Sequence, residues 1–235
     1  MVYTFLKIFN EKEHAEQFLK GELYMQTLRD FKDWKDENGE LRGDPLEGIT
    51  AYFQPDSVDI ILGDKQVNPK ELSSPIVIHN DSLLGINAFC LYSLNSDGFE
   101  KITNENIFQF KNILSIHKEC YGLGGYCVCI LKPNEFIDKI AQKLDTTNFN
   151  YISGLVKYFD ERSFSGELDS KYHGLQKRSS YSHQREFRLL VDRKLSTPSR
   201  FTLSIGDISE YCTGILTPEE FNDILKIQLP HGEVV

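Results

Sequence analysis

The segment from Tyr181 to Arg188 gathers polar side chains directly before an apolar strand, and it is the segment best suited to catalysis. Gln184, Glu186 and Arg188 follow one another at intervals of two residues. Because neighbouring side chains of a strand point to opposite faces, these three are expected to share one face. A polar face at the start of a core strand costs free energy when buried, unless each of its groups finds a partner. The competing interpretation is an edge strand with a solvated polar face and an Arg–Glu ion pair.

A second polar cluster lies far upstream, in a loop predicted at residues 36–48 that is rich in turn formers and charges. Arg42, Asp44 and Glu47 can form a polar rim that faces the strand after Gln184, and Pro45 would stiffen the loop that carries them. The alternative is a turn with an aspartate cap and an exposed ion pair, which contributes little to stability. The occurrence of both clusters in one chain favours the functional interpretation, so we expect them to meet.

The charge balance limits the partners. Lys and Arg total 26 against 35 for Asp and Glu, a net charge of -9, which argues against unspecific attraction to phosphate backbones. A small basic group remains around the late motif, made up of Lys177, Arg178, Arg185 and Arg188. Such a group suits one anionic ligand. One hypothesis is therefore a non-catalytic sensor or interaction domain in which Arg178, Arg185 and Arg188 grip an anionic nucleotide or a partner.

Metal chemistry gives a further alternative. Asp44, Glu47 and Glu186 would hold magnesium through their oxygens if all three converged in one cleft, as in a metal-dependent nuclease. Cys127 and Cys129 alternate on an apolar strand, a pattern more typical of buried packing than of a zinc site, so we predict no metal centre there. The sequence contains no Walker motif, no dinucleotide-binding glycine motif at a helix start and no serine-hydrolase elbow.

Composition predicts one ordinary globular domain spanning residues 1–235. The chain is 40% hydrophobic and 26% charged, without internal repeats or a low-complexity linker. It has neither an apolar stretch long enough to span a bilayer nor a signal peptide, and its five cysteines lack the spacing of a disulfide framework. We therefore expect a cytoplasmic protein without membrane contact and with reduced, mostly buried thiols. The sequence does not specify an oligomeric state.

Periodicity predicts strands and helices that do not alternate regularly. Expected strands cover residues 2–8, 23–25, 49–53, 58–62, 76–79, 86–94, 126–131, 187–191, 201–205 and 214–216. We expect 187–191 and 201–205 to pair, and Gly63-Asp64 to form a hairpin turn. Expected helices begin after a cap at Asn10, at 28–34, at 103–117, at 133–144 and at Thr217, while 152–159 fits either state. This order favours an α+β fold whose mainly antiparallel central sheet is flanked by helices.

The late motif resembles that of a known superfamily. Gln-x-Glu before an apolar strand is similar to the carboxyl-terminal motif of ADP-ribosyltransferases, whose sheet is split. The resemblance implies that Glu186 hydrogen-bonds the nicotinamide ribose of NAD and stabilises an oxocarbenium-like transition state. It implies that Gln184 positions the acceptor, since an amide cannot act as a general base. Tyr181 is a further residue expected to contact NAD or the acceptor.

The amino-terminal part resembles the same superfamily. Its members open with a strand that holds a histidine or arginine, then a helix, a glycine and a short strand, and Lys7, Gly21 and Tyr24 follow that order here. Lys7 gives a point charge in place of a guanidinium fork. The second strand motif of these enzymes places an aromatic residue or a serine near the nicotinamide, so Tyr92 and Ser93 are alternative NAD contacts.

The overall motif order looks like that of an uncharacterised bacterial family. That family has Asn-Asp-Pro-aromatic-Glu early, Cys-aromatic-Ser in the middle and aromatic-x-x-Glu-x-Glu-aromatic-Arg late, and here these correspond to residues 43–47, 90–93 and 181–188. Gly43, Leu46 and Gln184 depart from the pattern. The resemblances together imply an NAD-dependent domain that ADP-ribosylates a protein or nucleic acid, as a bacterial toxin or phage-defence effector would.

Overall fold

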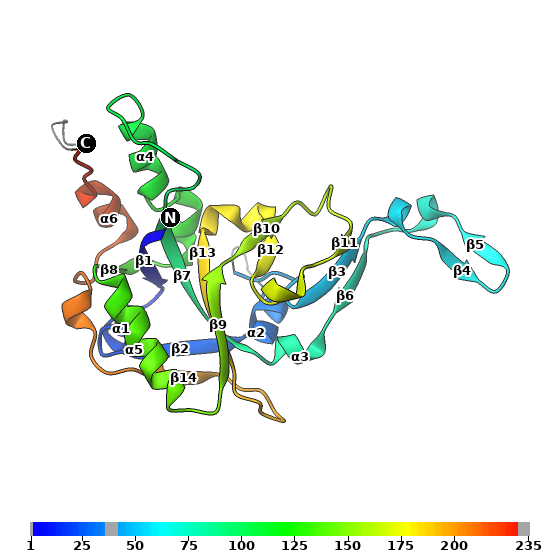
Figure 1. Ribbon diagram of the computed structural model, residues 1–235, viewed down its shortest axis with the longest axis horizontal. Coiled ribbons are helices and arrows are strands. Elements are labelled where there is room, and N and C mark those ends of the chain that lie inside the picture. Colours follow the sequence, from blue (N-terminus) through cyan, green and yellow to red (C-terminus); the bar gives the residue numbers. More distant parts are fainter. Residues whose placement is uncertain (1, 36–41, 230–235) are drawn as a thin grey trace.

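A central antiparallel sheet forms the body of the protein. The computed structural model describes residues 2–35 and 42–229, and in this part of the chain the sheet has seven strands. They are β1 (Val2–Phe9), β2 (Glu22–Thr27), β7 (Asn87–Asn95), β8 (Tyr126–Ile130), β9 (Asn150–Leu155), β13 (Glu186–Asp192) and β14 (Phe201–Ser204). All their pairings are antiparallel. The predicted α+β fold with a mainly antiparallel sheet is confirmed (Figure 1).

Helices cover both faces of this sheet. They are α1 (Lys12–Leu19), α2 (Leu28–Asp33), α3 (Asp81–Leu84), α4 (Ile107–Leu114), α5 (Pro133–Asp145) and α6 (Pro218–Ile224). On one face Phe18 of α1 packs against Phe89 of β7 and Phe136 of α5. On the other face Phe221 of α6 shares a buried cluster with Leu6 of β1. The side-chain alternation of β1 and β7 therefore supplies a separate apolar core to each face.

The sheet is split along one edge of β7. Strand β13 pairs with residues 87–92 of β7, β1 with residues 92–95 and β2 with residues 87–88. Because positions 87, 88 and 92 have partners on both sides, β1 and β2 lie along the same edge of β7, opposite β13. Among the described strands, none pairs with residues 89–91 on that edge. Strands β1 and β2 therefore pair with opposite ends of β7 and leave a gap between them on this edge.

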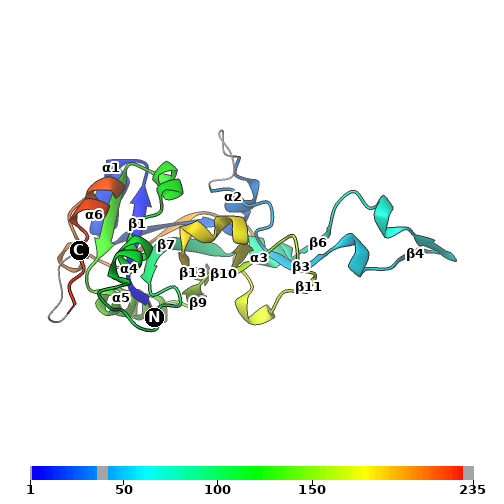
Figure 2. The same ribbon diagram turned by 90° about the horizontal axis from the view of Figure 1, so that it is seen from above.

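An arm projects from the body. At its base β3 (Ile49–Phe53) pairs with β6 (Ile76–His79) and with β11 (Gly166–Glu167). Beyond it, the arm (residues 54–75) carries the hairpin of β4 (Ile60–Leu62) and β5 (Lys65–Val67), together with two 3-10 turns, η1 (Pro55–Ser57) and η2 (Pro69–Glu71). Figures 1 and 2 show this hairpin far from the sheet. The hairpin turn predicted at Gly63-Asp64 is confirmed, with Gly63 at a φ of 68°.

Several predictions of pairing and capping are wrong. β13 and β14 do not pair. β13 lies between β7 and β9, whereas β14 pairs alongside β2. Residues 214–216 form only an isolated bridge to Cys127, through Leu216. Helix α1 begins after Glu11, without a side-chain cap, and not after a cap at Asn10. Tertiary pairing decides such details, and local patterns do not encode it.

Other predictions are confirmed. The capping box of Thr217 and Glu220 starts α6 as expected. The undecided residues 152–159 form β9 and a short strand, β10 (Lys157–Phe159). Of the charged loop predicted at 36–48, residues 36–41 lie outside the described residues. In the part that is described, no helix is long and apolar enough to cross a membrane.

The cysteines are free thiols. Burial raises the pKa of Cys129 to about 11 and the pKa values of Cys90, Cys120, Cys127 and Cys212 to about 12. A thiol with so high a pKa stays protonated near neutral pH and reacts slowly. The expected reduced and mostly buried state is confirmed.

The body and the arm should contribute very differently to stability. Leu144 of α5 is 1% exposed, whereas Leu62 of β4 is 68% exposed. We expect Leu144→Ala to lower the free energy of unfolding by about 2–5 kcal/mol, because it leaves a cavity in the core. Leu62→Ala should change it by less than about 0.5 kcal/mol. Urea denaturation of both variants measures this, and equal losses would contradict the separation of arm from core.

Candidate functional site

The late motif joins a 3-10 helix to a central strand. Helix η5 (Ser179–Gln184) ends at Arg185, which has a left-handed backbone with a φ of 44°, and β13 begins at Glu186. The predicted alternation therefore holds for Glu186 and Arg188 but does not extend back to Gln184. The Arg185 guanidinium is bonded elsewhere, to the main-chain oxygens of Ile113 and Asn95.

Arg188 is the centre of a buried polar network. It is 1% exposed. Nη1 donates to Glu47 Oε2 over 2.8 Å and to the Gly174 carbonyl over 2.9 Å, and Nη2 donates to Glu47 Oε1. Nε donates to Glu186 Oε1 over 2.8 Å, and Nη2 also donates to Glu186 Oε2 over 3.2 Å. Since a guanidinium has about five N–H donors, all of its hydrogen-bonding capacity is used.

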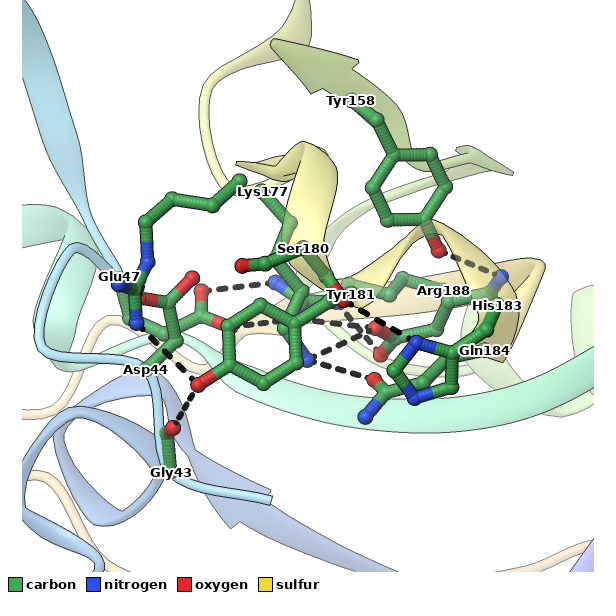
Figure 3. A network of polar contacts seen from close by, with 12 residues as sticks. Gly43, Asp44, Glu47, Tyr158, Lys177, Ser180, Tyr181, His183, Gln184 and Arg188 are labelled. Carbon is green, nitrogen blue, oxygen red and sulfur yellow. Dashed lines mark hydrogen bonds and ion pairs between the residues drawn. The ribbon is translucent and has the colours of Figure 1, made fainter. Parts of the chain in front are cut away.

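The Lys177 ammonium approaches the Glu186 carboxylate from another side than Arg188. It lies on β12 (Gln176–Arg178), which pairs in parallel with β10. The ammonium is 2.8 Å from Gln184 Oε1 and 3.5 Å from Glu186 Oε2, and it lies 4.3 Å from the centre of the Tyr181 ring. Figure 3 shows the side chains of Lys177, Tyr181 and Gln184 converging. Gln184 therefore reaches the network through Lys177, although it does not lie on the strand.

The early loop joins this network through Asp44. Arg178 donates from Nε to Asp44 Oδ1 over 2.9 Å and from Nη2 to the Tyr181 hydroxyl over 3.2 Å. The Tyr181 hydroxyl donates to the Gly43 carbonyl, as Figure 3 shows. Asp44 and Glu47 are 0% and 1% exposed. The expected meeting of the two clusters is confirmed, but it forms a buried ion-pair network and not an open rim.

The charges in this network determine which groups are ionised. Burial opposes ionisation of Glu186, but Arg188 and Lys177 outweigh it and hold the pKa of Glu186 below its usual value. Burial is the larger effect on Glu47 and raises its pKa despite Arg188. Burial also opposes the charge of Arg188, but Glu186 and Glu47 outweigh it and raise the pKa of Arg188. Glu186 is therefore a carboxylate at neutral pH.

Sequence reasoning missed two neighbours of Glu186. Tyr158 of β10 accepts a hydrogen bond from the Glu186 backbone N–H over 2.9 Å, and burial raises the pKa of this tyrosine. The Cys90 thiol lies beside the Glu186 carboxylate, and burial together with this charge raises its pKa to about 12. Tyr158 lay in a segment of undecided structure, and the resemblance included Cys90 in the Cys-aromatic-Ser motif without giving its thiol a role.

Lys7 lies on β1, and Tyr92 and Ser93 lie on β7, the strand between β1 and β13. Lys7 occupies the split, where Nζ donates to the Cys90 carbonyl over 2.7 Å, and burial lowers its pKa. Tyr92 is buried and donates to the Ser115 carbonyl over 3.1 Å. Ser93 is also buried and donates to the Arg185 carbonyl over 2.7 Å. The hydroxyls of Tyr92 and Ser93 are thus engaged within the protein.

Tyr24 and Arg42 lie outside the network. Tyr24 is 51% exposed on β2, which meets β7 at the end away from Glu186. Arg42 donates to Asn10 Oδ1 over 2.5 Å and to the Leu123 carbonyl, and its guanidinium lies 5.8 Å from the Trp34 ring centre. The expectation that Arg42 faces the late strand together with Asp44 is wrong, because Arg42 bonds instead to the segments that follow β1 and precede β8.

The two alternatives from the sequence fit this geometry poorly. Within residues 2–35 and 42–229, no three His, Cys, Asp or Glu side chains form a group that could hold a metal ion. Asp44 pairs with Arg178, and Glu47 pairs with Arg188. These pairs engage Arg178 and Arg188, two of the three arginines that were expected to grip an anion, and the third, Arg185, bonds the main-chain oxygens of Ile113 and Asn95. Both alternatives would therefore require existing buried ion pairs to break.

Comparisons with models of known protein families, with curated proteins and with solved structures found no match to this chain. The function is therefore argued from the geometry.

Removing the central guanidinium should destabilise the fold strongly. We expect Arg188→Ala to lower the free energy of unfolding by about 3–5 kcal/mol, because two buried carboxylates lose their partner. The matched control is Arg200→Ala, which removes a surface pair to Asp30 whose arginine side chain is 52% exposed. That change should cost less than about 1 kcal/mol. Chemical denaturation compares the two, and a small loss for Arg188→Ala would contradict the central role of this residue.

Glu186 should make stability depend on pH. Its folded pKa is lowered, so its contribution is present above the unfolded value of about 4.3 and is lost as the pH falls toward the folded value. We expect Glu186→Gln to be less stable than the wild type at about pH 7 and the difference to shrink below about pH 4. Denaturation at several pH values measures this. The exposed Glu105→Gln should show no such trend, and a gap that widens in acid would contradict the assignment.

Proposed function

We propose that this chain is an ADP-ribosyltransferase-like domain that binds NAD where β1, β7 and β13 meet. The observation that supports it is the adjacency of these strands, which bear Lys7, Tyr92 with Ser93, and Glu186. These are the positions to which the resemblance assigns the NAD contacts and the catalytic carboxylate. They come from distant parts of the chain, and the split in the sheet lies among them.

The charge state of Glu186 suits the proposed chemistry. Glycosidic cleavage of NAD develops positive charge on the nicotinamide ribose, and an ionised carboxylate stabilises that charge while accepting a hydrogen bond from a ribose hydroxyl. Arg188 would orient the carboxylate during this step, since it holds both carboxylate oxygens. Lys7 would place a positive charge on the opposite side of β7, within reach of an anionic part of NAD.

The described arrangement is closed over this carboxylate. Glu186 is 6% exposed, and Lys177, Gln184 and Tyr181 are buried beside it. Binding of NAD therefore requires η5 and Lys177 to move away. The 3.5 Å contact from Lys177 to Glu186 is long for a charge-assisted hydrogen bond, so Lys177 is the partner most easily displaced. The acceptor would be a protein or a nucleic acid held by a local surface, because the net charge of -9 repels phosphate backbones.

A second candidate function follows from the saturation of Arg188. If the network serves only to join the early loop to β13, the chain is a non-catalytic interaction domain. Buried ion pairs with every donor satisfied are found at structural positions as well as at active sites. This candidate predicts that loss of Glu186 acts through stability alone.

The experiment compares Glu186 with Glu47, since both carboxylates pair with Arg188. Purified wild-type protein is incubated with NAD labelled in its adenylate half and with cell extract, and label transfer and NAD hydrolysis are measured. Glu186→Gln should lower the rate at least ~100-fold, the scale of losing a transition-state contact. Glu47→Gln removes a carboxylate from the same Arg188 and should retain activity in proportion to its folded fraction.

Folded fractions come from thermal unfolding of the same samples. No transfer and no hydrolysis by the wild type would reject the proposal. Equal losses for both variants, each explained by instability, would favour the interaction domain.

A further inference from the structure

Helix η5, which buries the Glu186 carboxylate, is joined to a neighbouring 3-10 helix by His183. That helix is η3 (Lys118–Leu123). The His183 side chain is 15% exposed, and its Nδ1 lies 3.1 Å from Glu119 Oε2 and 3.1 Å from the Ser180 carbonyl oxygen. Figure 3 shows the second of these contacts. His183 belongs to the late motif, but the proposed chemistry gives its ring no role.

The contacts of His183 fix the tautomer of its ring. Both partners of Nδ1 are oxygen atoms that accept hydrogen bonds, so Nδ1 carries the proton, and Nε2 of the neutral ring carries a lone pair. Nε2 is buried and has no hydrogen-bond partner among the described residues. A second proton would place a charged N–H donor there without an acceptor, which costs free energy. The closed arrangement therefore accommodates a neutral His183 and disfavours a protonated one.

Most of the groups around His183 also disfavour a positive charge on its ring. The His117 ring centre lies 5.7 Å from that of His183, and the Lys177 ammonium on β12 repels a positive charge as well. Glu119 on η3 attracts it, but the Glu119 side chain is 66% exposed, so water weakens that attraction. Cys120 on η3 is a protonated thiol that donates to the His183 carbonyl over 3.5 Å. Burial, the largest effect, lowers the pKa of His183, and His117 and Lys177 add to it.

Release of η5 from η3 would uncover the candidate site. Tyr181 and Gln184 lie on η5 and are buried beside Glu186. The helix is joined to β13 through Arg185 alone, whose backbone is left-handed with a φ of 44°. Residues at the ends of elements are where a backbone turns most readily in a hinge motion. The contact made by His183 therefore acts on the segment that limits access to the carboxylate.

We propose that His183 is a pH-sensitive switch, in which the neutral ring holds η5 against η3 and over Glu186, and the protonated ring releases it. In the open state the ring is in water, where a histidine has a pKa of about 6.5. The pKa in the closed state is lower. The closed state therefore has its full advantage above about pH 6.5 and loses it as the pH falls toward the closed value.

Glu186 keeps its charge over the range in which the switch acts. Arg188 and Lys177 outweigh burial and hold the pKa of Glu186 below its usual value, which is about 4.3. At about pH 5.5 an opened site would thus still present a carboxylate. The consequence for catalysis rests on the proposed function, whereas the movement of η5 does not.

Hydrogen exchange of the full chain tests the switch. The protection of the η5 backbone amides is measured at about pH 7.5 and about pH 5.5, with correction for the intrinsic pH dependence of exchange. Wild-type protection should fall at the lower pH by up to about tenfold, the limit for an open-state pKa that lies about one unit above that pH. Protection of β8, which contributes nothing to the network, should stay constant, so local opening is distinguished from unfolding.

Two variants at one position separate charge from other effects of acid. His183→Asn cannot titrate, so η5 should be equally protected at both pH values. His183→Lys carries a permanent charge and should leave η5 poorly protected at both. The matched control is His14→Asn, which removes an exposed histidine of α1 and should behave as the wild type does. Burial also raises the pKa of Glu47, but every variant retains Glu47, so a difference between them belongs to His183.

Wild-type protection of η5 that does not change with pH would overturn the inference, and so would an equal change in His183→Asn. High protection in His183→Lys at the higher pH would contradict it as well. Label transfer and NAD hydrolysis on the same samples address catalysis, where His183→Lys should exceed the wild type at the higher pH. If no sample is active, the proposed function fails, while the exchange data still decide whether His183 controls η5.

Discussion

The guanidinium of Arg188 is the interaction on which the architecture depends. Its donors reach Glu47 in the early loop, Gly174 before β12 and Glu186 on its own strand. A charge without partners in such a place would cost several kcal/mol, and the penalty falls only when each donor meets a well-placed acceptor. The surrounding loops are thereby fixed, because each supplies an acceptor that water cannot replace. Strand β3, at the base of the arm, begins two residues after Glu47, so the same contact lies close to the base of the arm.

Under the proposed function, this network would serve both structure and chemistry. Arg188 and Lys177 keep Glu186 ionised although it is buried, which is the state required to stabilise positive charge. The contacts that order the Glu186 carboxylate also bury it, so the same contacts limit access to it. The 3-10 geometry of η5 and the left-handed Arg185 concentrate the closure in one short segment.

Local patterns were sufficient for some features and insufficient for others. Turn formers and period-two apolarity indicated the hairpin at Gly63 and most central strands, since these depend on residues close in sequence. The meeting of the two polar clusters was also foreseen. Their ion-pair partners were not, because Arg188 and Glu47 are separated by 141 positions and the pairing is decided by how strands assemble. Lys177 was noticed only as one of several basic residues, and nothing local revealed that it would lie over Tyr181.

The protonated thiols have a practical consequence. With pKa values of about 11 to 12, the native cysteines contribute almost no thiolate near neutral pH, and alkylating probes react through the thiolate. A new cysteine at an exposed position of the hairpin such as Asp64 would therefore be modified far faster than any of them. The wild-type background can remain intact while a single fluorophore or spin label is attached to the hairpin. Its position relative to the sheet then becomes measurable in solution.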